Sequence, residues 1–215
     1  CVLYYLHQFF KKKSTEYSSK QYWEGRYGWF SQRMDWYTNY NQLNRDFKID
    51  NIIKEKYPNN YHKKKILEMG CGNSTLSYDL YNSGYKNITA IDFSTVVIAK
   101  MSDIYCDTKI DFQVCDFNNM SIHFGQNEFD IIIEKAGLDS IATKGTKDVP
   151  DLLYNIFKNI YYVLQDGGIL LSFSSKNTNF WRVNIYDRLE REKLFKVVDT
   201  KRTIFKTKGS TVNMN

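Results

Sequence analysis

Apolar positions along the chain follow two spacings, and the spacing changes near residue 62. Aromatic and aliphatic residues between positions 19 and 57 recur every three or four residues, which is typical of one face of short helices. Gly25 and Gly28 interrupt this pattern and predict a turn. From residue 63 onward, short apolar runs alternate with amphipathic segments, which predicts strands alternating with helices.

The second part of the chain predicts a parallel sheet. Predicted strands cover residues 65–69, 87–92, 110–115, 129–134 and 169–174, and predicted helices cover residues 74–83, 94–101 and 150–164. Ser94 is placed to cap its helix, and the pair Gly167-Gly168 predicts a helix stop. This order predicts an α/β fold, in which a doubly wound, mostly parallel sheet carries helices on both faces.

A chain of 215 residues suits one domain. We expect an aromatic-rich helical lid over residues 1–62, a core over 63–175 and a substrate-side region over 176–215. Weak alternation over residues 194–206 predicts an antiparallel edge strand. Residues 211–215 resemble the start of a further strand, so we expect the chain to be truncated there.

Composition narrows the function classes. The net charge is +6, but the basic residues are scattered, so a solvated surface is favoured over nucleic-acid binding. No apolar run is long enough to span a membrane. Four cysteines without a C-x-x-C pair, and three histidines, argue against a zinc site. Free thiols suit a reducing compartment, and we expect a cytoplasmic protein.

Polar residues and glycines stand where the predicted strands end. Glu68 precedes the turn of Gly70 and Gly72, where the backbone allows a ligand to approach closely. Asp92 ends the next strand and is placed to accept hydrogen bonds from a ribose. Asp116 follows the third strand. Ligands of doubly wound sheets bind outside these strand ends, so the residues predict a nucleotide-type cofactor.

Three features favour S-adenosylmethionine (SAM) over a nicotinamide cofactor. The third glycine of the dinucleotide pattern, which helps to hold a pyrophosphate, is missing. Glu68 would repel a pyrophosphate but suits the ammonium and sulfonium groups of SAM. After the third strand, Asp116 can accept from an adenine amine while Phe117 covers the ring.

Plainer interpretations stay open for each residue. Gly70 and Gly72 could form an ordinary strand-to-helix turn. Asp92 could only cap a helix, Asp116 could be an ordinary loop aspartate, and Lys135 could be a surface charge.

Four segments carry a resemblance to a known family: YWEGRY at 22–27, MDWY at 34–37, ILEMGCGNSTLSYDLYNSGYKNITAIDFSTVVIAKM at 66–101 and FDIIIEKAGLDSI at 129–141. The chain resembles class I SAM-dependent methyltransferases that modify lysines of elongation factor 1-alpha, of the endothelin-converting-enzyme-associated and methyltransferase-like 13 type. The resemblance implies SAM as the cofactor, S-adenosylhomocysteine (SAH) as the product, and a protein substrate similar to elongation factor 1-alpha.

The resemblance and the strand-end chemistry together define the expected cofactor site. In the lid it comprises Trp23, Arg26, Tyr27 and Trp36, and in the core Glu68, Gly70, Gly72, Asn73, Asp92, Phe93, Asp116, Phe117, Glu134 and Lys135. Arg26 is placed to meet the cofactor carboxylate, and Leu138-Asp139 to shape the acceptor side. No residue is identified as a catalytic base, and no metal is expected.

One segment departs from the family pattern. The family reads EKGTLD after the fourth strand, whereas residues 134–139 read EKAGLD. A small-molecule methyltransferase is one alternative to lysine methylation, because a fold does not fix the substrate. The altered segment keeps a second alternative open, a non-catalytic SAM-binding scaffold. A nicotinamide oxidoreductase is less favoured. Neither the acceptor residue nor the oligomeric state follows from the sequence.

Overall fold

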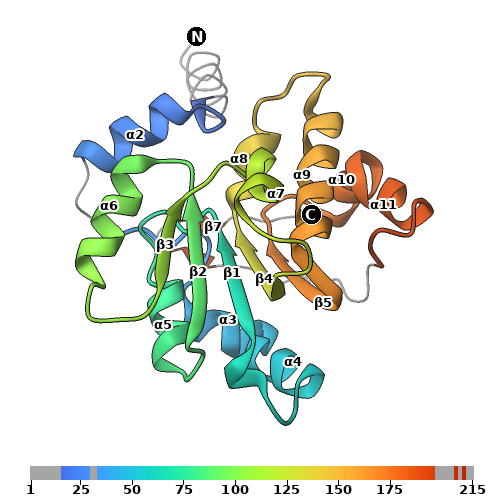
Figure 1. Cartoon of the computed structure of the whole chain (residues 1–215). Coiled ribbons are helices and arrows are strands. Elements are labelled where there is room, and N and C mark those ends of the chain that lie inside the picture. Colours follow the sequence, from blue (N-terminus) through green and yellow to red (C-terminus); the bar gives the residue numbers. More distant parts are fainter. Residues whose placement is uncertain (1–15, 30–32, 197–205, 208–209, 212–215) are drawn as a thin grey trace.

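A computed structural model describes residues 16–29, 33–196, 206–207 and 210–211. Its centre is a five-stranded sheet in the order β3-β2-β1-β4-β5, and every strand pairing within it is parallel (Figure 1). The strands are β1 (Lys65–Met69), β2 (Asn87–Asp92), β3 (Asp111–Val114), β4 (Phe129–Lys135) and β5 (Leu164–Phe173). The predicted parallel α/β sheet is therefore confirmed.

Helices cover both faces of the sheet (Figure 1). The first face packs against α2 (Lys20–Trp29), α3 (Tyr40–Phe47), α4 (Ile49–Lys56), α5 (Leu76–Asn82) and α6 (Thr95–Ile104). The second packs against α7 (Met120–His123), α8 (Gly137–Ala142), α9 (Val149–Val163), α10 (Thr178–Trp181) and α11 (Asp187–Arg191). Alternate residues of β4 explain the two layers, because Ile131 and Ile133 enter the first core while Ile132 enters the second.

The predicted turn at Gly25 and Gly28 is wrong, because both glycines lie inside α2. A glycine costs a helix about 1 kcal/mol relative to alanine. Burial of Trp23 and Tyr27 on the same helix offsets that cost, since each side chain is less than a tenth exposed. Tertiary packing therefore outweighs the local preference of the two glycines.

The pair Gly167-Gly168 does not end the preceding helix, because α9 stops at Val163 and the glycines lie within β5. A Cβ atom on Gly168 would lie 2.9 Å from the Asp130 carbonyl oxygen. Glycine is therefore needed at 168 for the close approach of β5 to β4, whose pairing shifts register there.

The C-terminal strand predictions fall largely outside the described residues. The structure describes β6 (Lys206–Thr207) and β7 (Ser210–Thr211), which form a separate antiparallel pair. The predicted edge strand over 194–206 covers residues 197–205, and the predicted strand over 211–215 covers residues 212–215, all of which are outside the description.

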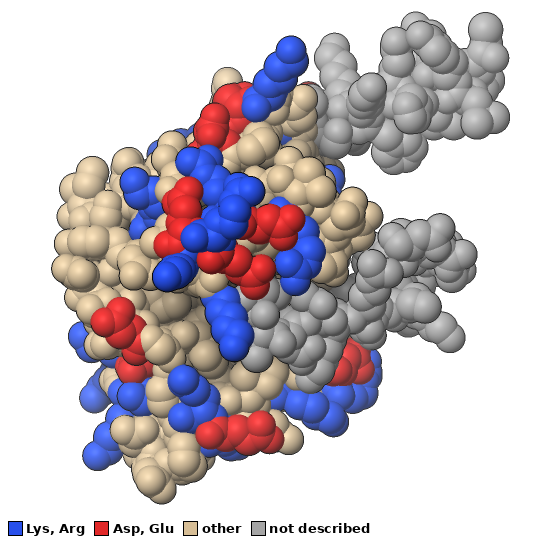
Figure 2. Space-filling view, turned by 90° about the vertical axis from the view of Figure 1, so that its right-hand side faces the viewer, with Lys and Arg blue, Asp and Glu red and all other residues tan. Residues whose placement is uncertain are grey.

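Charged side chains of both signs are interleaved on the face shown in Figure 2. Arg188 pairs with Asp151 and Glu192, and Arg182 pairs with Asp187. Such pairs suit a solvated surface rather than a field of one sign. None of the described helices is long and apolar enough to cross a bilayer.

Candidate cofactor-binding site

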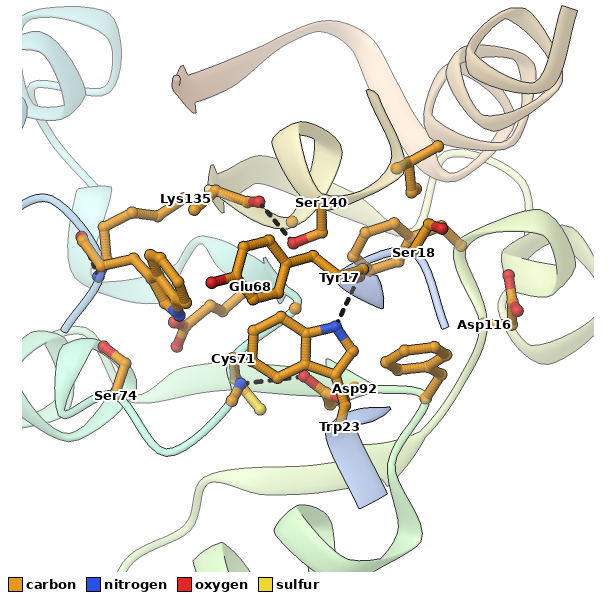
Figure 3. Close-up of a pocket in the computed structure, with 18 of the residues that line it drawn as sticks. Tyr17, Ser18, Trp23, Glu68, Cys71, Ser74, Asp92, Asp116, Lys135 and Ser140 are labelled. Atoms are coloured by element: carbon orange, nitrogen blue, oxygen red, sulfur yellow. Dashed lines mark hydrogen bonds between the residues drawn. The ribbon is translucent and has the colours of Figure 1, made fainter. Parts of the chain in front are cut away.

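A cavity of about 1110 Å³, its open mouth included, lies at the carboxyl ends of the strands, between the core and the N-terminal segment. All but two of the residues predicted for the cofactor line it: Trp23, Tyr27, Trp36, Glu68, Gly70, Gly72, Asn73, Asp92, Phe93, Asp116, Phe117 and Lys135. The fold thus collects residues that are far apart in the sequence into one pocket (Figure 3).

The glycine turn after β1 is built for close contacts. Gly70 and Gly72 have φ angles of 68° and 50°, a region that residues with a Cβ rarely adopt. A Cβ on Gly72 would lie 2.7 Å from the Tyr27 hydroxyl oxygen, and one on Gly70 would lie 3.0 Å from the Phe117 ring. Both glycines therefore serve the pocket as well as the turn.

Asp92 joins the two loops that border the pocket. It is 5% exposed, and its carboxylate accepts hydrogen bonds from the backbone N–H groups of Gly72 at 3.1 Å and Ser94 at 3.0 Å. The cap of α6 is Ser94, as predicted, since its side chain accepts from the Val97 N–H. Asp92 is therefore more than a helix cap. Its burial raises its pKa to about 6.

Glu68 and Lys135 form the polar end of the pocket. Glu68 accepts a hydrogen bond from the Ser77 hydroxyl, and burial raises its pKa to about 7. The Lys135 side chain is 4% exposed, so it is not a surface charge. Its ammonium donates to the Trp36 carbonyl at 3.0 Å and forms an ion pair with Asp35 at 3.4 Å.

Asp116 lies at the opposite end of the pocket from Ser74 (Figure 3). Its carboxylate accepts from the Asn118 N–H at 2.8 Å, which begins the turn that carries Phe117. The Phe117 ring packs between Gly70 and Gly137, where a Cβ on either glycine would come within about 3.1 Å of it. The ring is thus held as one wall of the pocket.

Aromatic rings of the N-terminal segment form the facing wall. Trp23 stacks on Tyr27 with ring centroids 5.5 Å apart and meets Trp36 edge-on at 6.0 Å. The Trp23 indole N–H donates to the Tyr17 carbonyl at 2.7 Å, as the dashed line between them in Figure 3 shows. The predicted aromatic lid is therefore in contact with the cofactor pocket.

Glu24 fastens this lid to the core, a role that sequence reasoning missed. Its carboxylate accepts hydrogen bonds from the Ser94 hydroxyl at 2.6 Å, the Thr95 N–H at 3.0 Å and the Val96 N–H at 3.2 Å. An acidic side chain suits the positive end of α6. The contact places α2 beside the helix that follows Asp92.

Arg26 and Glu134 do not line the pocket. The Arg26 guanidinium donates to the Tyr22 hydroxyl and the Met34 sulfur. Glu134 is fully buried and accepts from the Leu138 N–H and the Ser172 hydroxyl, so its carboxylate organises the start of α8. The described contacts of both residues lie within the protein, so the direct cofactor contact that we expected of them stays a prediction.

Several lining residues were not predicted from the sequence. They are Tyr17, Ser18, Met34, Cys71, Ser74, Asn118, Ala136, Gly137, Ser140, Ile141, Lys144 and Leu152. Ser74 lies within the conspicuous GCGNS segment, so its position was a usable signal. Cys71 lies in the same segment, and Asn118 directly follows Asp116 and Phe117. The others depend on how the lid, α8 and α9 approach the strand ends.

The residues fit a SAM-sized cofactor with a cationic end. Glu68 is a buried carboxyl group in the pocket, Asp92 is placed for a diol, and Phe117 offers a ring face between two glycines. Among the described residues, no cluster of His, Cys, Asp and Glu could hold a metal ion. Fold and pocket together define a nucleoside-cofactor-binding α/β domain.

Comparison with known proteins identifies the family. A family model described as a methyltransferase domain matches residues 61–205. The eEF1A lysine and N-terminal methyltransferase of Homo sapiens is 30% identical over 167 residues, covering 76% of this chain and 22% of that protein. EEF1A lysine methyltransferase 4 of Mus musculus is 28% identical over 182 residues, covering 79% of this chain and 66% of that protein.

The Drosophila pseudoobscura pseudoobscura homolog of the first relative is 30% identical over 161 residues, with 73% of this chain and 22% of that protein covered. The chain thus spans about a fifth of the length of these longer relatives. The chain belongs to the methyltransferase domain family. It is a SAM-dependent methyltransferase domain, and SAM rather than a nicotinamide is its cofactor.

The altered EKAGLD segment has a backbone consequence. Ala136 has a φ of 71°, so alanine occupies a left-handed position, and the EKGTLD pattern that the segment resembles has glycine there. Gly137 follows, where a side chain would press on Phe117. The glycine at 137 therefore leaves space for the Phe117 ring, whereas the alanine at 136 has a strained backbone.

Replacing Ala136 with glycine is expected to stabilise the protein by up to about 1 kcal/mol, because a left-handed alanine costs about 1–2 kcal/mol and glycine loses part of that gain through entropy. Thermal unfolding would register a Tm higher by a few degrees. Ala142→Gly, the same change at the end of α8, should instead lower the Tm. A lower Tm for both variants would contradict the strain at Ala136.

SAM binding is expected to weaken about tenfold between pH 8 and pH 6, because the Glu68 pKa of about 7 means that the ionised form is lost over this range. Titration calorimetry at several pH values would measure it. Unfolding at pH 6 would not cause the weaker binding. A buried carboxyl group whose pKa is raised stabilises the folded protein at low pH, and this contribution is lost as the pH rises through 7.

The Glu68→Gln variant, which cannot ionise, is the control for this titration. Its affinity for SAM should be low at pH 8 and should vary less with pH, with Asp92 and its pKa of about 6 accounting for the remaining dependence. An equal affinity of the wild-type protein at pH 6 and pH 8 would show that Glu68 is not coupled to the cofactor.

Proposed function

We propose that the chain methylates a lysine side chain of a protein similar to elongation factor 1-alpha. The observation that carries the proposal is the aromatic wall of the pocket, formed by Tyr17, Trp23, Tyr27 and Trp36 opposite the strand-end carboxylates. The names of the three relatives, each of which describes eEF1A lysine methylation, support the same acceptor.

The wall suits the chemistry of an amine acceptor. Bound SAM supplies a methyl group on a positively charged sulfur. A lysine must be neutral to accept it, and an apolar, aromatic surrounding lowers a lysine pKa by desolvation. The same ring faces stabilise the methylated ammonium product through cation–π attraction.

Ser140, which directly follows the altered segment, supplies a polar group to the pocket. The Ser140 hydroxyl lines the pocket and donates to the Ala136 carbonyl at 3.2 Å, which leaves its oxygen lone pairs to accept from an incoming amine. Positioning of this kind is the main contribution that such an enzyme makes to an in-line methyl transfer. Leu138 and Asp139, expected to shape the acceptor side, support it from behind the pocket lining.

Incubation with SAM and purified elongation factor 1-alpha tests the proposal. Intact-mass spectrometry should show added methyl groups, and fragmentation should place them on a lysine side chain rather than on the N-terminal amine. The Asp92→Asn variant is the matched control. An unchanged mass with wild-type enzyme that binds SAM would reject this substrate.

Two alternatives have distinct outcomes in the same experiment. SAH formed with a small amine or other small acceptor, and none with elongation factor, would indicate a small-molecule methyltransferase. SAM binding with no SAH formed from any acceptor would indicate a scaffold. A translation-factor substrate and the free thiols Cys71, Cys106 and Cys115 also support our inference of a cytoplasmic location.

A further inference from the structure

Residues 34–37, here called the strap, link the lid helix to the core beside the cofactor pocket. Met34 and Trp36 of the strap line the pocket. Asp35 and Tyr37 alternate with them and make the polar contacts to the core. The strap therefore places one kind of side chain in the pocket and uses the other kind to hold its position.

Three parts of the core hold the strap: the glycine turn after β1, the end of β4 and helix α8. Asp35 accepts from the Ser74 hydroxyl, which belongs to the glycine turn after β1. The Trp36 carbonyl accepts from Lys135 at the end of β4 at 3.0 Å. Tyr37 donates its hydroxyl to Asp139 of α8 at 2.5 Å, across a sequence separation of 102 residues.

Asp139 is the most connected of these anchors. It is 5% exposed, and its carboxylate also accepts from the Ser174 hydroxyl at 2.5 Å and from the Ser175 N–H and hydroxyl, each at 2.7 Å. Hydrogen bonds to a charged acceptor are about twice as strong as neutral ones. Asp139 thus ties the strap to α8 and to the segment after β5.

The backbone of the strap is strained at this anchor. Tyr37 has a φ of 64°, although it is not a glycine. Such conformations cost about 1–2 kcal/mol and persist where the surrounding structure holds them, often at ligand clamps. The Tyr37 hydroxyl, which donates to Asp139 and also lies 3.0 Å from the Ser175 hydroxyl, fixes this residue directly after Trp36.

We propose that Asp139 is a positioning residue for methyl transfer, which acts through Tyr37 to hold Trp36 over the cofactor pocket. Asp139 does not line the pocket itself. Its effect reaches the cofactor through the strap. Loss of the Tyr37–Asp139 hydrogen bond lets Trp36 move away from the pocket, so the cofactor dissociates faster. The proposal rests on cofactor binding at this pocket and not on the identity of the methyl acceptor.

Tyr37→Phe removes the hydroxyl and keeps the ring, and SAH dissociation measured by surface plasmon resonance tests its effect. The variant should release SAH about tenfold faster than wild type, because one hydrogen bond to a charged group is lost from the closed strap. In steady-state assays the KM for SAM should rise more than kcat falls.

Tyr40→Phe is the matched control, because the Tyr40 hydroxyl donates to the Asp50 carboxylate at 2.9 Å away from the pocket. It should lower the Tm by a similar amount and leave the SAH dissociation rate within about twofold of wild type. If the Tyr37–Asp139 bond contributed to stability alone, Tyr37→Phe and Tyr40→Phe would release SAH at the same rate.

Asp139→Asn completes a double-mutant cycle. The two changes share the Tyr37–Asp139 bond, although Tyr37 also contacts Ser175 and Asp139 also accepts from Ser174 and Ser175. The double variant should therefore release SAH more slowly than the product of the two single effects predicts. If Asp139→Asn does not fold, the comparison of Tyr37→Phe with Tyr40→Phe decides by itself. An unchanged dissociation rate in Tyr37→Phe overturns the proposal, whereas a wild-type protein that does not bind SAH overturns cofactor binding itself.

Discussion

Replacing Asp92 with asparagine is expected to weaken SAM binding at least about a hundredfold. The carboxylate is buried at the end of β2 and accepts from the backbone N–H groups of Gly72 and Ser94, so it fixes both loops that border the pocket. It is also the acceptor placed for the ribose hydroxyls, where each hydrogen bond to a charged group contributes about 1.5–3 kcal/mol. Titration calorimetry measures the loss.

The asparagine also turns an amide donor toward N–H groups that already donate, which disturbs the glycine turn. Asp103→Asn, on the exposed side of α6, is the control and should leave SAM affinity unchanged. A dissociation constant of Asp92→Asn within tenfold of wild type would remove Asp92 from the cofactor site.

The second large effect is expected from Gly70→Ala, with Gly167→Ala as a matched control. Their φ angles are 68° and 70°, so both alanines incur a similar left-handed strain of about 1–2 kcal/mol. A Cβ on Gly167 meets nothing within 4 Å, whereas one on Gly70 comes 3.0 Å from the Phe117 ring. Only Gly70→Ala therefore disturbs the pocket.

The two variants should lose similar stability, with Tm values a few degrees below wild type. Gly70→Ala should in addition lose at least about tenfold in SAM affinity, because Phe117 is displaced from the wall that it forms between Gly70 and Gly137. Calorimetric titration of both variants with SAM separates the effect of the backbone strain, which both share, from the effect of the Cβ contact with Phe117, which only Gly70→Ala makes. Equal affinities would mean that the space above Gly70 is not part of the cofactor site.

The residues at the strand ends were predictable from the sequence, because each polar residue of the site stands at or just after the end of an apolar run that predicts a strand. Glu68, Asp92 and Asp116 lie at or just after the carboxyl ends of β1, β2 and β3, which the parallel sheet must bring to one edge. Local order along the chain is enough to place them. The pocket contains all three.

The lid half was less predictable because its position depends on contacts between distant segments. Tyr37 meets Asp139 across 102 residues, and Glu24 meets Ser94 across 70. No periodicity in the sequence encodes either pairing. Gly25, placed in a turn from its intrinsic preference, instead lies in a helix whose aromatic face is buried against the core.

Thermal unfolding with SAM, SAH and NAD tests the central claim most directly, because a ligand that binds only the folded protein raises the Tm. SAM and SAH should each raise the Tm by several degrees, and NAD should leave it unchanged. A Tm that rises with NAD, or that stays constant with both SAM and SAH, would contradict the assignment of this pocket to S-adenosylmethionine.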